Sequence, residues 1–407
     1  MIPVAAGPCH PDFTALADAL GGIECAAANP VVTVRDPGEL QSWTQPVLEL
    51  LMVTGAVAAL IHAVLWWRRH GDPGNLGLWL ATVVYVLILE PPLYFPDRFG
   101  LDEQVGLIFV HNVFTVQFLF DRLPLYIVAL YPAMTYLAYA LVQQAGILDR
   151  RSPLVGAACV AVVFHVGYEI FDQIGPDLRW WVWNPAAPSN APMLGDAPLT
   201  SAVIFAAAAP FGTVLLTRLL LAGRPLRAWR VAAVGVLTPL AMMAFSIPTL
   251  PFGPSGRTVV LWCELAALAV VAIMAVTRQG EGVAALSPKA WPGRKRERSP
   301  QGRPEGRSQG RPEGRSQGRP EGRPQGRPEG RPEEGSEEGP SGGLGEGLTG
   351  NPAERTALGA ATVYLAVMLL LWTAGSGPPM AIVYALGWAA ILLALSRRTL
   401  ADIGQRL

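Results

Sequence analysis

Long apolar stretches alternate with short polar segments along this chain, and the pattern predicts most of its architecture. A run of about twenty apolar residues can cross the hydrocarbon core of a bilayer as one helix. Such runs lie at 46–67, 76–94, 123–144, 153–171, 198–222, 231–249, 258–277, 356–374 and 378–396. Each is expected to be helical, because lipid offers no partner for an unpaired backbone group. The predicted fold class is therefore all-α, a polytopic transmembrane helix bundle with nine spans.

A tenth segment, 104–120, is shorter than the nine and contains His111 and Asn112. Polar groups at membrane depth are tolerated only where protein or a water-filled cavity surrounds them. We therefore expect this segment to be re-entrant or interfacial and to dip in from the outer face.

The distribution of basic residues supports that interpretation. Arg68 and Arg69 follow the first span, and further basic clusters begin at Arg150. If 104–120 crossed the membrane, these later clusters would face the side opposite to the first cluster. If it does not cross, all of them share one side, as the positive-inside rule requires. The predicted protein is a multi-pass protein of the cell membrane, with segment 1–44 outside and the C-terminus in the cytoplasm.

Composition changes abruptly at 280–353, where Gly, Pro, Arg and Glu replace the aliphatic residues. An octapeptide, GRPEGRSQ, occurs four times within Gly302–Glu333 with small changes between the copies. A segment with so little apolar surface to bury cannot offset the entropy lost on ordering. We expect a disordered linker between a main bundle at 45–279 and a C-terminal two-helix hairpin at 354–407. The linker is interpreted either as a tolerated expansion or as a cytoplasmic tether.

The overall composition limits the classes of function. Of the 407 residues, 51% are hydrophobic and 15% are charged, whereas soluble domains contain about 25% charged residues. A soluble enzyme, a nucleic-acid binder and a coiled coil are therefore excluded. The net charge of zero is uninformative about partners, because the charges are segregated along the chain. The cysteines form no metal or disulfide pattern, although Cys9 and Cys25 could pair if the N-terminal segment is exported.

Candidate chemistry gathers at the outer ends of the predicted helices. Ionisable residues inside spans are costly and are therefore candidate functional groups. The densest group is His165, Glu169 and Asp172, whose i, i+4, i+7 spacing places them on one helical face. The other polar candidates expected at this level are Glu90, His111, Asn112, Asp121, Asp177 and Asn184.

Acids clustered in a dry site favour the protonated form, which can donate a proton to a carbon–carbon double bond. Nearby tryptophan faces can stabilise the resulting cation. We expect an integral membrane enzyme that hydrates, cyclises or isomerises an isoprenoid or other lipid, with no cofactor, no metal and no nucleic-acid partner. The candidate catalytic residues are Glu169, Asp172, Asp177, Glu90, Asp121 and His165. The candidate substrate-binding residues are Trp180, Trp181, Trp183, His111, Asn112 and Asn184.

Each of these residues also has a structural interpretation. The tryptophans are typical of an aromatic belt at the headgroup level. His165 could make an interhelical hydrogen bond, and Glu264, within the span at 258–277, could be a packing residue or a cavity wall. The sequence neighbours Asp121–Arg122 and Asp177–Arg179 could form local ion pairs. The spacing of His165, Glu169 and Asp172 also permits a metal site completed by His111.

Two functions of other classes remain open. A transporter would use the polar cluster to bind a solute, but the duplicated halves expected of a transporter are not seen among the predicted spans. In a non-catalytic scaffold, the long polar segment 280–353 would be the functional region.

The region around 165–205 resembles the signature region of the carotenoid 1,2-hydratases, membrane proteins of carotenoid biosynthesis. The resemblance rests on an acidic pair that ends a helix, a Gly-Pro step, a WW-x-W segment, a Pro-rich loop and a Pro-Leu-x-Ser helix start. It aligns the acidic positions of the family with Glu169 and Asp172, and its tryptophans with Trp181 and Trp183.

This resemblance implies acid-initiated addition of water to a terminal isoprenoid double bond. Glu169 or Asp172 would protonate the alkene, and the two tryptophans would shield the tertiary cation. A second carboxylate, Asp177 or Glu90, would then remove a proton from the incoming water.

Overall fold

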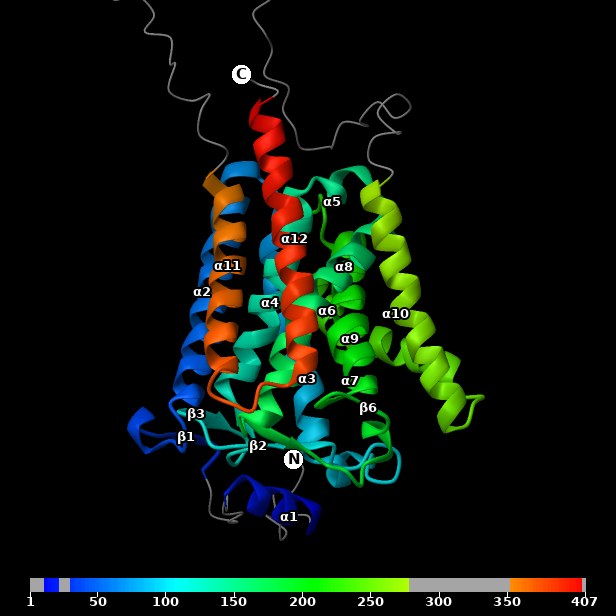
Figure 1. Cartoon of the computed structure of the whole chain (residues 1–407). Coiled ribbons are helices and arrows are strands. Elements are labelled where there is room, and N and C mark those ends of the chain that lie inside the picture. Colours follow the sequence, from blue (N-terminus) through cyan, green and yellow to red (C-terminus); the bar gives the residue numbers. More distant parts are fainter. Residues whose placement is uncertain (1–10, 22–29, 278–351, 405–407) are drawn as a thin grey trace, which may run out of the picture. The chain divides into compact units, whose positions relative to one another are not determined.

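The computed structural model describes residues 11–21, 30–277 and 352–404, and within them the protein is a helix bundle with short strands at one end (Figure 1). Eight of the described helices are long and apolar enough to cross a membrane, and α11 adds a shorter apolar stretch. The long helices are α2 Thr44–His70, α3 Gly74–Tyr94, α4 Leu125–Gln144, α6 Pro153–Asp177, α9 Ala228–Ser246, α10 Pro254–Thr277, α11 Pro352–Trp372 and α12 Pro379–Gly404, together with the continuous run α7 Leu199–Val203, η4 Ile204–Ala208 and α8 Ala209–Leu220. The predicted all-α polytopic bundle is confirmed, and the protein is a multi-pass integral membrane protein.

Each of the nine predicted spans falls on one of these helices, with α7, η4 and α8 forming a single span. The helix α11 begins at Pro352, just inside the predicted linker 280–353. Cys9, Cys25 and the octapeptide repeats lie outside the described residues.

The shorter elements occupy the connections between the long helices. They are α1 Pro11–Leu20, β1 Val32–Val34, η1 Pro37–Glu39, η2 Pro96–Phe99, β2 Phe109–His111, β3 Val116–Phe118, β4 Leu123–Pro124, α5 Ile147–Arg150, β5 Trp181–Trp183, η3 Pro188–Asn190, β6 Met193–Leu194, β7 Ala197–Pro198 and η5 Ile247–Thr249. All seven strands lie at the end of the bundle where α3 and α6 finish and α4 and α7 begin. We call this the strand end.

Segment 104–120 is not a helix. It forms β2 and β3, and these strands belong to two different small sheets at the strand end. The strand β2 pairs antiparallel with β5, and β3 lies between β1 and β4. The backbone groups of these strands therefore find partners in other loops, and the segment packs over the bundle without crossing it.

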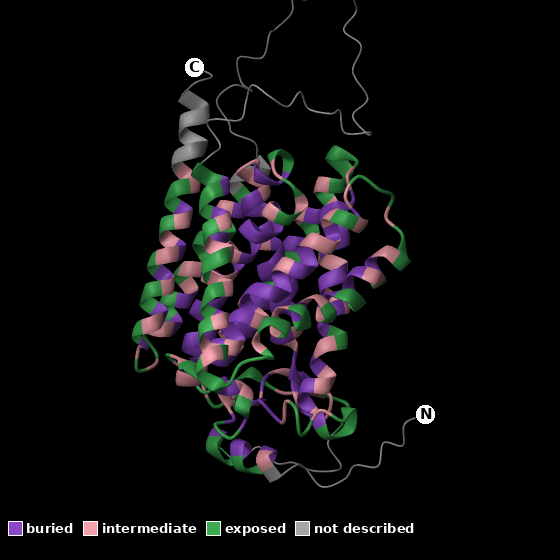
Figure 2. Cartoon of the chain, turned by 90° about the vertical axis from the view of Figure 1, so that its right-hand side faces the viewer, coloured by how far each residue is buried: buried purple, intermediate pink, exposed green. Residues whose placement is uncertain are grey.

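The core is centred on α4, whose membrane-length window is 83% buried. Figure 2 shows buried residues concentrated in the middle of the bundle, with exposed positions on the outer helices. The helix α4 contacts α2, α3, α6 and α11. The tyrosines on α4, such as Tyr126 and Tyr131, are buried in this core.

The C-terminal hairpin of α11 and α12 packs on the same bundle. Gly167 of α6 has no Cβ, and one built there would lie 2.7 Å from the ring of Trp388 on α12. The hydroxyl of Tyr364 on α11 donates to the carbonyl oxygen of Gly167 at 2.7 Å. Because both contacts converge on one glycine of α6, the hairpin and the preceding helices form one compact unit.

Local signals at the helix ends explain how the chain reverses between spans. Gly71 ends α2 in the left-handed conformation (φ 70°), and its N–H bonds the carbonyl of Trp67. Helix α6 begins after Ser152, whose side chain accepts from the N–H of Val155, with proline at the first helical position. These are common devices for satisfying the free backbone groups at helix ends.

Candidate functional site

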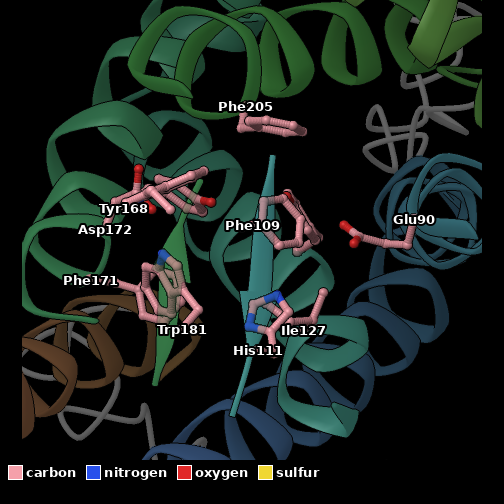
Figure 3. Close-up of a pocket in the computed structure, with 11 residues that line it drawn as sticks. Glu90, Phe109, His111, Ile127, Tyr168, Phe171, Asp172, Trp181 and Phe205 are labelled. Carbon is pink, nitrogen blue, oxygen red and sulfur yellow. The ribbon is translucent and has the colours of Figure 1, made fainter. Parts of the chain in front are cut away.

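A cavity of about 30 Å³ lies beneath the strands, among the ends of α3, α4, α6 and η4. Figure 3 shows side chains from these helices and from β2 and β5 converging on it. Its walls are Glu90, Phe109, His111, Ile127, Tyr131, Tyr168, Phe171, Asp172, Trp181, Trp183 and Phe205. A space of this size holds one or two water molecules.

The β2–β5 ribbon sets two aromatic pairs on the cavity wall. In its antiparallel register Phe109 is opposite Trp183, and His111 is opposite Trp181. Because successive side chains of a strand point to opposite faces, these four share one face. Val110 and Val182 lie on the other face, in a separate apolar cluster with α1. The alternating sequences FVH and WVW therefore build a two-sided ribbon, with α1 covering its outer side.

Two buried carboxyl groups meet at this cavity. Glu90, near the end of α3, and Asp172, near the end of α6, are 2% and 1% exposed. In Figure 3 they approach from opposite sides, with the ring of Phe109 between them. The hydroxyl of Ser201 on α7 donates to Asp172 Oδ2 at 2.9 Å, whereas Glu90 Oε2 has no hydrogen-bond partner among the described residues. Asp172 is therefore held by a hydroxyl group from α7, whereas one oxygen atom of Glu90 is left without a hydrogen bond.

Glu169 lies one helical turn before Asp172 but does not line the cavity. It is fully buried, and its Oε2 accepts a hydrogen bond from Gln173 Nε2 at 3.4 Å. Gln173 in turn donates to the carbonyl of Leu194 at 2.8 Å and accepts from the N–H of Asp196 at 2.9 Å. This glutamine fixes the β6–β7 turn over the end of α6, and Glu169 Oε1 has no partner in the part of the chain that the structure describes.

His111 is held neutral by its surroundings. Its Nδ1 lies 2.9 Å from the Tyr126 hydroxyl, and its ring packs against Tyr94, Phe109 and Trp181. Burial lowers the pKa of His111 to about 3, because the charged imidazolium loses its hydration there. At neutral pH this ring is uncharged and can take part in hydrogen bonds, but it is neither a proton donor nor an effective base.

Aromatic rings form most of the remaining wall. Trp181 packs on Phe171 with ring centroids 4.8 Å apart, and on Trp183 at 6.2 Å. Gly175 of α6 permits this placement, because a Cβ there would overlap the indole of Trp181. The wall offers ring faces, which attract cations, together with a few polar atoms.

Asp121 lies outside the cavity and forms an ion pair with a residue far from it in the sequence. Its Oδ2 is 3.0 Å from Nη2 of Arg35. The backbone at Asp121 is left-handed (φ 64°), as it is at the two preceding residues, and this turn separates the neighbouring side chains. Arg122 instead stacks over the rings of Phe13 and Phe95, at 4.0 and 4.7 Å from their centroids.

Asp177 also makes contacts different from the predicted pair with Arg179. It accepts from the N–H of Ser376 at 2.8 Å, from the Ser376 hydroxyl, and from the N–H of Gly377 at 3.3 Å. The carboxylate therefore attaches the α11–α12 loop to the end of α6 and does not reach the cavity. Arg179 is exposed, in the left-handed region (φ 57°).

Three of the predicted substrate-binding residues support the loops around the site. The Trp180 indole donates to Thr44 Oγ1 at 3.1 Å. Asn112 donates to the carbonyl of Arg179 at 2.8 Å, and Asn184 to the carbonyl of Leu107 at 2.8 Å. The two asparagines hold the ends of β2 and β5 together, and Trp180 ties β5 to the start of α2. None of the three residues lines the cavity.

His165 and Glu264 lie deeper in the membrane-spanning region, away from the small cavity. His165 Nδ1 is 3.2 Å from the carbonyl oxygen of Ala202 on α7, the interhelical hydrogen bond that its position in an apolar span suggests. Glu264 is half-buried on α10, and its Oε2 has no hydrogen-bond partner within the described ranges.

Several residues of the site were not predicted from the sequence. Tyr131 and Tyr168 line the cavity from within long apolar helices, where a tyrosine hydroxyl among aliphatic residues is the available signal. Glu49, near the start of α2, accepts from the N–H groups of Thr115 and Val116 at 3.1 and 3.2 Å. This buried carboxylate holds the β2–β3 loop and so helps to position His111.

The metal interpretation finds no geometric support, since no group of three His, Cys, Asp or Glu side chains within the described ranges is arranged to hold an ion. Comparison of the chain with models of protein families, with curated proteins and with solved structures finds no match. The arguments about function therefore rest on the site itself.

Proposed function

We propose that this integral membrane protein is an enzyme that protonates a carbon–carbon double bond of an isoprenoid or other lipid. One observation carries the proposal: Glu90 and Asp172, from helices far apart in the sequence, face the same aromatic-walled cavity. Placing an unpaired carboxylate in such a space costs several kcal/mol. A neutral carboxylic acid is the form that this environment favours, and it is a proton donor.

The chemistry needs only these acids and, for hydration, one water molecule. The acid O–H bond breaks, its proton bonds to the less substituted alkene carbon, and a tertiary cation and a carboxylate remain. In hydration, water bonds to the cation and loses one proton to the second carboxyl group, which is ionised while the first is protonated; passing that proton to the first carboxylate restores the acid. In isomerisation, the carboxylate removes a proton from an adjacent carbon. In cyclisation, another double bond of the substrate attacks first, and the proton is then lost from the new cation.

The geometry favours Asp172 as the acid within the pair Glu169 and Asp172, because Asp172 lines the cavity. It favours Glu90 over Asp177 as the second carboxyl group, since Asp177 is engaged with the α11–α12 loop. Trp181 and Trp183 are then the rings that stabilise the cation, as the resemblance to the carotenoid 1,2-hydratases implies. His111, neutral at physiological pH, is suited to orienting the water.

We further propose that the strand end faces the outside of the cell membrane. The end of α2 carries Arg68 and Arg69, the start of α6 follows Arg150 and Arg151, and α8 ends near Arg218. These basic positions lie at the end of the bundle opposite to the strands. The positive-inside rule then places them, and the C-terminus, in the cytoplasm.

The test compares lipid extracts from cells that express the protein, a deletion strain and three carboxyl variants. Asp172→Asn and Glu90→Gln should each lower product formation by about 100-fold or more, the range for loss of a general acid or base. Glu264→Gln is the matched control, because it removes a carboxyl group that does not line the cavity, and it should leave product formation unchanged.

All three variants must accumulate in the membrane and melt as the wild type does. If Asp172→Asn and Glu90→Gln are silent in every lipid and pigment profile, the enzyme proposal is wrong and a scaffold role is favoured. If the same two variants instead abolish solute flux in proteoliposomes, the protein is a transporter.

A further inference from the structure

A second, larger space opens on the side of the bundle, between α6, η4, α10 and α12. Its volume is about 330 Å³, against about 30 Å³ for the cavity at the carboxyl groups. Its walls are mostly aliphatic and include Ala161, Ala207, Trp262 and Ala269, with His165 and Tyr384 as the polar members. We call this space the lateral groove.

The two outer helices of the lateral groove face lipid. Only 11% of the apolar window of α10 and 22% of that of α12 are buried, against 67% for α6. Figure 1 shows α10 leaning away from the neighbouring helices. A groove between lipid-facing helices opens to hydrocarbon, so its natural occupant is an apolar chain.

The inner wall of the groove is shared with the small cavity. On η4, Phe205 lines the cavity and Ala207 lines the groove. On α6, His165 lines the groove and Asp172 lines the cavity, with Glu169 between them on the same face. The two spaces are therefore adjacent along one polar face of α6.

The polar side chains of the groove can receive a ligand. The carbonyl of Ala202 can only accept, so the neutral ring of His165 carries its proton on Nδ1 and leaves Nε2 as an acceptor. The ring of Tyr384 packs edge-on against His165 with centroids 5.6 Å apart, and no hydrogen bond of its hydroxyl is found among the described residues. The segment η4 is π-helical, a conformation that often marks functional sites within helices.

We propose that the lateral groove binds the hydrocarbon chain of the substrate and admits it sideways from the membrane, with its reacting end directed along His165, Glu169 and Asp172 towards the cavity. This inference rests on the proposed function and names its access route. It addresses a difficulty of scale, because the small cavity has room for one or two water molecules and not for a lipid chain.

The experiment uses a long-chain, unsaturated hydrocarbon probe with a diazirine, incorporated into proteoliposomes of the full-length protein. After illumination, the labelled residues are mapped by mass spectrometry. Labels should concentrate on the walls of the groove in α6, α10 and α12, and excess unlabelled isoprenoid alcohol should displace them. Ala269→Trp, which fills the groove, should lower this labelling by about tenfold.

Ala267→Trp is the matched control, because Ala267 is an exposed residue of α10 that does not line the groove. It should leave the labelling unchanged. If Ala269→Trp is unstable, Ala269→Leu fills the groove less severely and should give a smaller loss in the same direction.

Two results overturn the inference: labelling spread evenly over all lipid-facing helices, or equal labelling of Ala269→Trp and Ala267→Trp. The outcome is separable from that of the proposed function, since Asp172→Asn should keep the labelling while it loses product. If the groove is labelled but Asp172→Asn does not change product formation, the lipid-binding site stands and the proposed acid chemistry is wrong.

Discussion

His111 illustrates how a single buried side chain links the site to pH. The imidazole is 5% exposed, with Tyr126 beside its Nδ1 and three aromatic rings around it. Its charged form is excluded by burial, so the folded protein binds a proton at His111 much less readily than the unfolded chain does. This difference in proton binding makes the stability of the folded protein depend on pH, which can be measured.

The expected effect is a loss of stability in acid. The pKa of His111 is about 3 in the folded protein and about 6.5 in an unfolded chain. Between these values the unfolded state binds more protons, so stability falls as the pH falls. From pH 7 to pH 5 this one group should lower the free energy of unfolding by about 2 kcal/mol.

The measurement compares wild type and His111→Gln, unfolded by SDS in mixed micelles at both pH values. The variant lacks the titrating ring and should lose about 2 kcal/mol less than the wild type over this range. Equal pH dependence of the two proteins would show that His111 is not desolvated as the structure indicates.

Among the elements, the start of α12 is held in place by hydrogen bonds to the end of α6. Asp177 at the end of α6 accepts hydrogen bonds from two backbone N–H groups and one hydroxyl group of the loop that precedes α12. Hydrogen bonds to a charged group contribute about 1.5–3 kcal/mol. Asp177→Ala should therefore loosen the start of α12, and with it the outer wall of the lateral groove.

Hydrogen–deuterium exchange in detergent should show the change. Peptides from 379–396 should exchange faster in Asp177→Ala than in the wild type, while peptides of α4 should not change. Asp149→Asn, an exposed carboxyl group in α5 at the opposite end of the bundle, serves as the control. Unaltered exchange in α12 would mean that the loop is held by other contacts.

At the scale of the whole molecule, the C-terminal hairpin is bound by packing that does not require a continuous chain. Trp388 fits against Gly167, and Tyr364 bonds the carbonyl of that same residue. Helices inserted independently into a membrane associate through this kind of close contact between small and large residues. Two fragments, 1–300 and 340–407, should therefore assemble when they are expressed together.

Co-purification through a tag on the longer fragment tests this expectation, and the shorter fragment should be recovered in equal amount. Gly167→Leu should abolish recovery, because its side chain would occupy the place of the Trp388 ring. Gly359→Leu, in α11 where a Cβ meets no atom within 4 Å, should not. Failure of the unmodified fragments to associate would show that the connecting segment is needed for assembly.

The helices could be predicted because lipid imposes a length and a composition on each span. The sequence also indicated that Glu90, His111 and Asp172 lie near one another, because the number of spans between them places all three at the same face of the membrane. The strand pairing of 104–120 could not be predicted in this way, because β2 finds its partner in β5, more than sixty residues later. The alternation in FVH and WVW is the local signal, and it is too short to distinguish a strand from a buried loop.

The partners of Asp121 and Asp177 are a second feature that the sequence could not supply, and the reason is geometric. The sequence allows Asp121 and Asp177 to pair with neighbouring arginines, but Asp121 binds Arg35 and Asp177 binds the loop at Ser376. Left-handed backbone at Asp121 and at Arg179 turns adjacent side chains apart. Such contacts depend on tertiary structure, and no spacing rule within one segment can supply them.

The opposed positions of Glu90 and Asp172 have a stereochemical consequence for the proposed reaction. A planar alkene that reaches one of these carboxyl groups from the aromatic-walled cavity presents a single π-face to it. A proton delivered from one fixed wall enters a single face, so deuterium from heavy water would occupy only one of the two prochiral positions on the new methylene carbon. The handedness of the product would then be determined by which wall of the cavity carries the acid.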